Sequence, residues 1–339
     1  MNTDFDYLTA LPGEEREQHW IKSRLETLSV REGIILAAAV QKEPPESTDQ
    51  AINTLQALDY YNVCYPAGSY EQLGRHYLSH FNVPAEALPY IDFDQLGRQY
   101  EDQHPGLFVG SCYVEYPKTA PTPVCQAGGI LPGDDAWSVK LKVASPTVPE
   151  GVWLRLPDPS GFDCEAGSEV ELAKDALHVQ RWDECVLLNA FCTLPEAGRL
   201  MEQYDDVADL LYDGQNLGYV LLERGRGEEG WQEKFAAALE LEGCRNLKLL
   251  LDISQNMSCY EWVPSEGLKD FAAEHLRSCG VSDQLIQSGC IDLEGYAEDL
   301  LENSGYMLAG DESGYMTRNN RPFVREYTQE PEPMEQVMG

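Results

Sequence analysis

Tyr90-Ile91-Asp92-Phe93-Asp94-Gln95-Leu96-Gly97-Arg98-Gln99-Tyr100 is the stretch that decides the fold, because the chain carries a second form of it, Cys290-Ile291-Asp292-Leu293-Glu294-Gly295-Tyr296-Ala297-Glu298-Asp299-Leu300. In both forms apolar residues recur at the spacing of one helix face, and Asp92 or Asp292 stands where an N-cap residue belongs. A glycine suited to a left-handed turn and a short strand-like run follow each helix. The repeated unit is therefore predicted to be a helix, a glycine turn and a strand.

The segments upstream of the two forms also match. A helical pattern precedes each form, and Leu58-Asp59-Tyr60 in the first half corresponds to Leu251-Asp252-Ile253 in the second. Matched flanks around a matched motif indicate an internal duplication rather than two unrelated capped helices. We call residues 8–117 the first copy and residues 191–318 the second copy.

The composition is strongly acidic. The 339 residues give room for two or three small domains with their own cores. Lys and Arg number 24 against 58 Asp and Glu, which leaves a formal net charge of −34. This sign opposes direct binding to nucleic acid phosphates, and it fits a protein partner that itself binds nucleic acid. An acidic solubilising surface and a salt-loving host are alternatives that composition leaves open.

The cysteines and the apolar runs predict the compartment. Ten cysteines contain no CxxC pair, which argues against a zinc knuckle or a thioredoxin-type site. The first residues have neither a basic region nor an apolar core, so no signal peptide is predicted. The longest strongly apolar run, Ile34 to Val40, is too short to span a bilayer. We expect a soluble, cytoplasmic protein with reduced thiols and no membrane partner.

Local patterns divide the chain further. Helices are predicted over residues 14–28, 33–40 and 52–58. From Trp137 the pattern changes: strands are predicted over residues 138–143, 151–157 and 185–188, and a helix is predicted to start near Glu169. We therefore predict an α+β fold, an elongated chain of small α and α/β modules with one β-rich module and an internal duplication. The predicted segments are 1–118 (first repeat), 119–135 (Pro/Gly-rich linker), 136–193 (β-rich module), 194–320 (second repeat) and 321–339 (acidic flexible tail).

Acidic residues follow helical spacing in three places. Pro195 is predicted to open a helix with an apolar stripe of Leu200, Tyr204, Val207 and Leu211, and an acidic stripe lies on the opposite side. The second copy has a ladder of acids four residues apart, and the first copy has a milder group around Arg98. The predicted partner-binding carboxylates are Asp94, Glu101, Asp102, Glu202, Asp206, Asp209, Asp213, Glu294, Glu298 and Glu302. A purely solubilising role for these acids stays open.

The run Tyr-Ile-Asp-Phe-Asp-x-Leu-Gly-Arg from Tyr90, with a helix before it and Gly-x-Phe after it, resembles the C-terminal domain of ArdA-type antirestriction proteins. Residues 137–191 resemble the N-terminal β-rich domain of that family, and residues 194–222 resemble its helical middle domain. The second copy departs from the family pattern, since Gly295 and Ala297-Glu298 replace the expected aromatic residue and Gly-Arg.

The resemblance implies a function without catalysis. Proteins of this family are elongated acidic dimers that imitate the phosphate path of bent duplex DNA, occupy the DNA-binding groove of type I restriction-modification enzymes and are carried by mobile elements. The charge fits, because −34 equals the charge of about 17 base pairs. The resemblance thus implies a protein partner, no direct nucleic acid binding, no cofactor, no metal and no enzymatic activity. It leaves open a homodimer or an intramolecular pseudo-dimer of the two copies.

A nucleotide-binding enzyme is the rival interpretation. Gly225-Arg226-Gly227-Glu228-Glu229-Gly230 matches GxGxxG, after a strand-like run over residues 217–222 and before a helix predicted over residues 231–241. Glu228 and Glu229 oppose it, because they would repel a pyrophosphate at a site that attracts anions. The six histidines show no metal-ligand spacing. A third interpretation, an acidic adaptor for basic proteins, also stays open.

Overall fold

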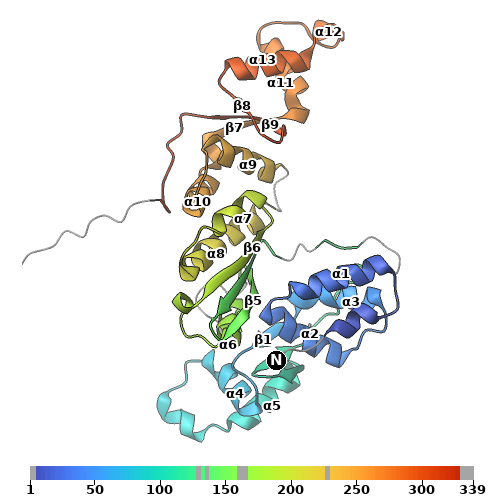
Figure 1. Ribbon diagram of the computed structural model, residues 1–339, viewed down its shortest axis with the longest axis vertical. Coiled ribbons are helices and arrows are strands. Elements are labelled where there is room, and N and C mark those ends of the chain that lie inside the picture. Colours follow the sequence, from blue (N-terminus) through green and yellow to red (C-terminus); the bar gives the residue numbers. More distant parts are fainter. Residues whose placement is uncertain (1–4, 127–130, 134–136, 159–166, 226–229, 329–339) are drawn as a thin grey trace, which may run out of the picture. The chain divides into compact units, whose positions relative to one another are not determined.

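The computed structural model describes residues 5–126, 131–133, 137–158, 167–225 and 230–328 (Figure 1). The fold class is α+β, as predicted, and the described residues form three small antiparallel sheets. The chain forms two compact units. The first unit comprises Met1–Phe191 with Asp205–Gly218, and the second comprises Cys192–Tyr204 with Tyr219–Gly339. We describe each unit separately.

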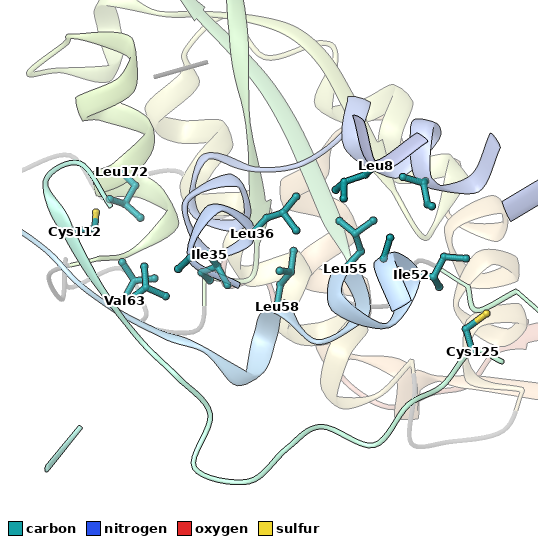
Figure 2. Packing of buried hydrophobic residues seen from close by; sticks show 14 residues of the cluster. Leu8, Ile35, Leu36, Ile52, Leu55, Leu58, Val63, Cys112, Cys125 and Leu172 are labelled. Carbon is teal, nitrogen blue, oxygen red and sulfur yellow. The ribbon is translucent and has the colours of Figure 1, made fainter. Parts of the chain in front are cut away.

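The first unit begins with a helical group: η1 (Asp6–Ala10), α1 (Glu15–Glu26), α2 (Val30–Lys42), α3 (Thr48–Gln56) and η2 (Leu58–Tyr60). The three helices predicted in this region are confirmed, with shifted ends. Helix α2 begins with a capping box, in which Ser29 Oγ accepts from the Glu32 N–H at 3.1 Å and Glu32 Oε2 accepts from the Ser29 N–H at 2.8 Å. Figure 2 shows the core that these helices enclose, where leucines and isoleucines of η1, α2, α3 and η2 pack together.

The first copy continues as β1 (Asn62–Cys64), α4 (Tyr70–Ser79), η3 (Ala85–Tyr90), α5 (Phe93–Gln103), β2 (Gly106–Val109) and β3 (Cys112–Glu115). The sheet has the order β1-β3-β2, and all its pairs are antiparallel. Asp92 caps α5 as predicted, accepting from the Gln95 N–H at 3.0 Å. Helices α4 and α5 meet backbone to backbone, since a Cβ on Gly97 would lie 2.0 Å from Tyr70 O. Only glycine permits this approach.

The β-rich module of the first unit is β4 (Val139–Ser145), β5 (Val148–Leu156), α6 (Glu169–Leu177), η4 (Trp182–Glu184) and β6 (Val186–Cys192), with the strand order β5-β4-β6. The three predicted strands and the helix starting at Glu169 are confirmed. Where residues 139–141 of β4 pair with residues 154–156 of β5, both faces of the pair are buried: Leu141 and Leu154 lie on one face, and Lys140 and Arg155 lie on the other. The charged face needs buried acids as partners.

A buried polar network supplies those acids and joins the β-rich module to the first copy. Glu32 of α2 bonds Arg24 of α1 and also Arg155 of β5, the latter at 2.5 Å. Arg155 reaches Asp59 at 3.1 Å, and Ser29 Oγ donates to Glu169 Oε1 at 2.8 Å. Burial alone would raise the pKa of Glu32, but the two guanidinium groups lower it to about 2. Glu32 is therefore an anion that holds three elements together.

The second unit contains α7 (Pro195–Met201), α9 (Trp231–Leu241), α10 (Leu247–Gln255), η5 (Met257–Cys259), β7 (Tyr260–Pro264), η6 (Ser265–Gly267), α11 (Leu268–Ser278), α12 (Asp283–Ile286), α13 (Leu293–Asn303), β8 (Met307–Leu308) and β9 (Gly314–Arg318). From α9 onward, the second unit follows the element order of the first copy from α2 onward, with an added η6 and with α12 in the place of η3. Its sheet order, β7-β9-β8, reproduces β1-β3-β2. Where α4 and α5 meet at glycines, α11 and α13 meet at the buried alanines Ala272 and Ala297. The internal duplication is thus visible in both topology and packing.

Two predictions about residues 195–223 were wrong. The single helix predicted from Pro195 is two helices, α7 and α8 (Val207–Glu223). The new helix begins directly after Asp206, because the Asp206 side chain accepts a hydrogen bond from the Ala208 N–H at 2.7 Å. The run Leu217–Leu222, predicted as a strand, lies inside α8. Its buried leucines Leu217 and Leu221 are four residues apart, which is the helical period.

Each copy is followed by a segment that returns to its own helical group. We call residues 117–126 and 319–328 the return segments. In the first, Asn53 of α3 accepts from the Val124 and Cys125 N–H groups, both at 2.8 Å. In the second, Asp252 of α10 accepts from the N–H groups of residues 326, 327 and 328 at 2.7, 2.8 and 3.1 Å. Residues predicted to be linker or flexible tail are therefore held by hydrogen bonds at one equivalent helix position; residues 329–339 lie outside the described residues. The predicted match of Leu58-Asp59-Tyr60 with Leu251-Asp252-Ile253 was thus wrong, because Asp59 lies in η2, whereas Asp252 lies in α10 and corresponds to Asn53 of α3.

Candidate protein-binding surface

Helix α13 presents the clearest acidic face. Asp292 caps it by accepting from the Gly295 N–H at 3.1 Å. Ala297 and Leu301 turn inward onto the core of the second copy, so Glu294, Glu298 and Glu302 lie on the exposed side. Three carboxylates four residues apart span about 12 Å along the helix. All three side chains are exposed.

Most of this charge is not neutralised locally. Glu294 pairs with Lys269 of α11 at 3.2 Å. Glu298 and Glu302 have no Lys or Arg partner in the described part of the chain. Burial raises the pKa of the Tyr315 phenol, and these two carboxylates raise it further. The free charge on α13 is therefore concentrated at its C-terminal half.

The surrounding module adds acids that are not among the predicted partner-binding carboxylates. Residues 260–318 contain twelve Asp and Glu against three Lys and Arg, and all twelve acids are exposed. Asp270 and Glu274 on α11, and Asp299 on α13, belong to this set. A count over the whole module, rather than a search for helical stripes, would have found them.

The equivalent module of the first copy is less charged. Residues 62–115 contain seven acids and two arginines. Asp94 pairs with Arg98 at 2.8 Å, and half-buried Glu101 accepts from the Tyr70 hydroxyl at 2.8 Å. Asp102 is exposed. Of the three carboxylates predicted here, Asp102 alone lacks a bonded partner in the described part of the chain.

The acidic stripe predicted over residues 202–213 does not exist as one helix face. Glu202 follows α7 and belongs to the second unit, whereas Asp206 and Asp209 are exposed at the start of α8 in the first unit. Asp213 was predicted to face solvent, and this is wrong, because its exposure is 2%. Helix α8 is buried almost all round at this point; a Cβ on Gly218 would lie 2.5 Å from Pro157 N.

Several other acids also contribute no surface charge. Among the described residues the buried carboxylates are Glu17, Glu32, Glu115, Asp158, Glu169, Asp213 and Asp252. The effective surface charge is therefore smaller than the formal net charge, and the comparison with about 17 base pairs is an upper bound.

The first copy holds a half-buried polar cluster at the junction of its sheet and helices. Cys64 Sγ donates to Glu115 Oε1 at 3.3 Å, and the Tyr100 hydroxyl donates to the same oxygen. His104 Nδ1 lies 3.7 Å from Glu115 Oε2, and its ring stacks on Tyr100. Burial and the Glu115 carboxylate raise the pKa of the Cys64 thiol well above its usual range. A protonated thiol is a poor nucleophile, so this cluster does not have the chemistry of a cysteine active site.

The remaining candidate sites find little support. No group of His, Cys, Asp and Glu residues in the described ranges could hold a metal ion. The GxGxxG run at Gly225–Gly230 lies largely outside the described residues, but α8 precedes it instead of the predicted strand, while α9 follows it as predicted. A dinucleotide-binding turn connects a strand to a helix, so its required context is missing on one side.

In comparisons with known proteins, no family model, curated protein or solved structure matches this chain. No helix within the described residues is both long enough and apolar enough to cross a membrane.

Proposed function

We propose that this protein is an antirestriction protein that mimics duplex DNA, and that it inhibits a type I restriction-modification enzyme by occupying its DNA-binding groove. The observation that supports this most is the second-copy module over residues 260–318, with twelve exposed acids and three basic residues. On α13 of this module, Glu298 and Glu302 have no Lys or Arg partner among the described residues. The resemblance of the Tyr90–Arg98 motif to ArdA-type proteins supports the same function.

The physical basis is electrostatic. A groove that binds DNA is lined with Lys and Arg, and DNA binds it largely by releasing counterions. Carboxylates fixed on a folded helix present negative charge to the same groove without the cost of ordering a flexible chain. The mechanism requires no catalytic residue, cofactor or metal. The proposed site of action is the cytoplasm, where such enzymes meet DNA.

Inhibition of DNA cleavage is the direct test. A type I enzyme would be assayed on a plasmid carrying its site, with increasing amounts of the protein, at several concentrations of duplex and of salt. We expect inhibition that excess duplex relieves and that weakens as salt rises, because the Debye length is only about 8 Å at physiological ionic strength. Inhibition that is indifferent to both would contradict mimicry.

The acidic adaptor remains the second candidate, since it uses the same surface. An adaptor would bind basic proteins in general, including ones that do not bind DNA. A matched binding assay with a type I enzyme and with a basic protein of similar pI separates the two. The assembly is tested by light scattering, which distinguishes the homodimer from the pseudo-dimer formed by the two copies of one chain.

A further inference from the structure

A cavity of about 540 Å³ opens in the second unit where α7, α9 and the β8–β9 turn meet. Its wall is apolar, with Leu200, Ala237 and Ala309 all buried. Its polar lining residues are Glu196, Glu240 and Asp311, with a single cation, Arg245. An apolar wall with a few converging polar groups is the usual composition of a ligand site.

Two of the carboxylates are held in place by the turn. Glu240 Oε2 accepts from the Gly310 N–H at 2.8 Å, and a Cβ on residue 310 would lie 2.8 Å from the other oxygen of Glu240. Glycine at this position therefore lets the carboxylate approach the backbone. Hydrogen bonds from the Ser313 hydroxyl and N–H lower the pKa of Asp311, which keeps it an anion. Preorganised groups bind without paying for their own ordering.

The first unit has a cavity at the equivalent place, and its chemistry differs. About 470 Å³ in volume, it is lined by Ala37, Val40 and Gln41 of α2 and by the β2–β3 turn at Gly110. Ala236, Leu239 and Glu240 of α9 keep the same spacing, and Gly310 takes the place of Gly110. The lining of the first cavity contains no charged residue. The cavity is thus a feature of the repeated fold, and the second copy has an acidic form of it.

We propose that the acidic cavity of the second unit binds an arginine side chain of the basic partner protein. This inference rests on the proposed function, and it adds one anchoring contact to a surface of otherwise weak ones. The lining has a formal charge of −2, which complements a cation. The aliphatic stem of arginine suits the apolar wall, and its planar, weakly hydrated guanidinium can bond more than one carboxylate. Arginine residues that fill such pockets commonly dominate protein interfaces.

The test uses the protein and short peptides, without the restriction enzyme. Isotope-labelled full-length protein would be titrated with the peptide acetyl-Gly-Arg-Gly-amide and, separately, with the same peptide carrying neutral citrulline, while backbone amide resonances are followed. We expect saturable shifts at Leu200, Ala237 and Gly310 with the arginine peptide and none with the citrulline peptide. Glu240→Gln keeps an oxygen for the Gly310 N–H but removes the charge, and should weaken peptide binding about tenfold.

Gln41→Glu in the first cavity is the matched control, and it should leave the shifts at the second cavity unchanged. Equal binding of both peptides, or equal binding to the wild type and to Glu240→Gln, would overturn the proposal. Inhibition of the restriction enzyme is measured in parallel. If the wild-type protein fails to inhibit, the proposed function is wrong, and the peptide titration still decides the cavity. If Glu240→Gln loses the peptide but inhibits as well as the wild type, the cavity is not the anchor for the partner.

Discussion

Glu169 is an acid that is buried close to another buried acid, Glu32. It is 2% exposed, its Oε1 accepts from Ser29, and its Oε2 has no hydrogen-bond partner among the described residues. Burial raises the pKa of Glu169, and the nearby Glu32 carboxylate raises it further, to about 8, although Arg155 and Arg31 act in the opposite direction. At neutral pH this side chain is thus mainly a neutral acid, which lets it sit beside the Glu32 anion.

The pH dependence of stability follows from this raised pKa. An unfolded Glu loses its proton near pH 4.3, whereas folded Glu169 keeps it until about pH 8. Between these values the folded state holds one more proton, so this group makes stability fall as pH rises. Glu169→Gln imitates the protonated form and should melt at a higher temperature than the wild type at pH 8, with a smaller difference at pH 5. Thermal unfolding across this range checks it, with exposed Glu150→Gln as the control; equal slopes would contradict the assignment.

At the scale of elements, the helix pairs of the two copies give a matched experiment. Gly97→Ala should destabilise the first copy by about 1–3 kcal/mol, because the added methyl would overlap Tyr70 O. Ala297→Gly in the second copy adds no atom. It should lower the free energy of unfolding by about 1 kcal/mol through helix propensity alone, and by a further amount because it leaves an empty space in the core. Urea unfolding of both variants measures the two values. A neutral Gly97→Ala would show that α4 and α5 are free to move apart.

The return segments allow a second prediction at this scale. Asp252→Ala removes the acceptor for three backbone N–H groups, so residues 319–328 should detach and become sensitive to protease. Asp252→Asn is the control, because asparagine already serves at the equivalent position 53. Burial alone would raise the pKa of Asp252, but the hydrogen bonds that it accepts from Thr328 and its neighbours lower this pKa. Its contribution is therefore present above about pH 3.9 and is lost as pH falls through the lower folded pKa.

The elements could be predicted where one physical signal dominated. The capped helices at Asp92 and Asp292 and the alternating strands of the β-rich module have local causes, and they were found. Helix α8 was misjudged because its middle is buried on nearly every side, which removes the contrast between faces on which a periodicity argument depends. The anchoring of the return segments could not be predicted, since it depends on contacts between residues more than seventy positions apart.

At the scale of the whole molecule, binding by mimicry should be distributed. Each exposed charge pair contributes only about 0–1 kcal/mol. A single change such as Glu298→Gln should therefore cost little, whereas neutralising Glu294, Glu298 and Glu302 together should weaken inhibition several-fold and flatten its salt dependence. The melting temperature should hold or rise slightly, because like charges four residues apart repel.

The matched control neutralises three acids of the first copy, Glu71, Asp94 and Asp102, two of which are already paired with arginines. It removes the same formal charge and should weaken inhibition less. Inhibition constants at two salt concentrations decide the comparison. Equal losses would mean that total charge matters rather than its position on α13, and a complete loss from one substitution would indicate a discrete active site.

The return segments also bear on how the chain folds. The bonds from Asn53 to Cys125 and from Asp252 to Glu326 join residues 72 and 74 positions apart. Closing a loop of this size costs chain entropy before the stabilising contact forms. The α4–α5 and α11–α13 pairs, in contrast, form between near neighbours in sequence. We therefore expect the helix pairs to assemble early and the return segments to close last. Since the two loops are almost equal in length, loop entropy alone does not favour earlier closure of either copy.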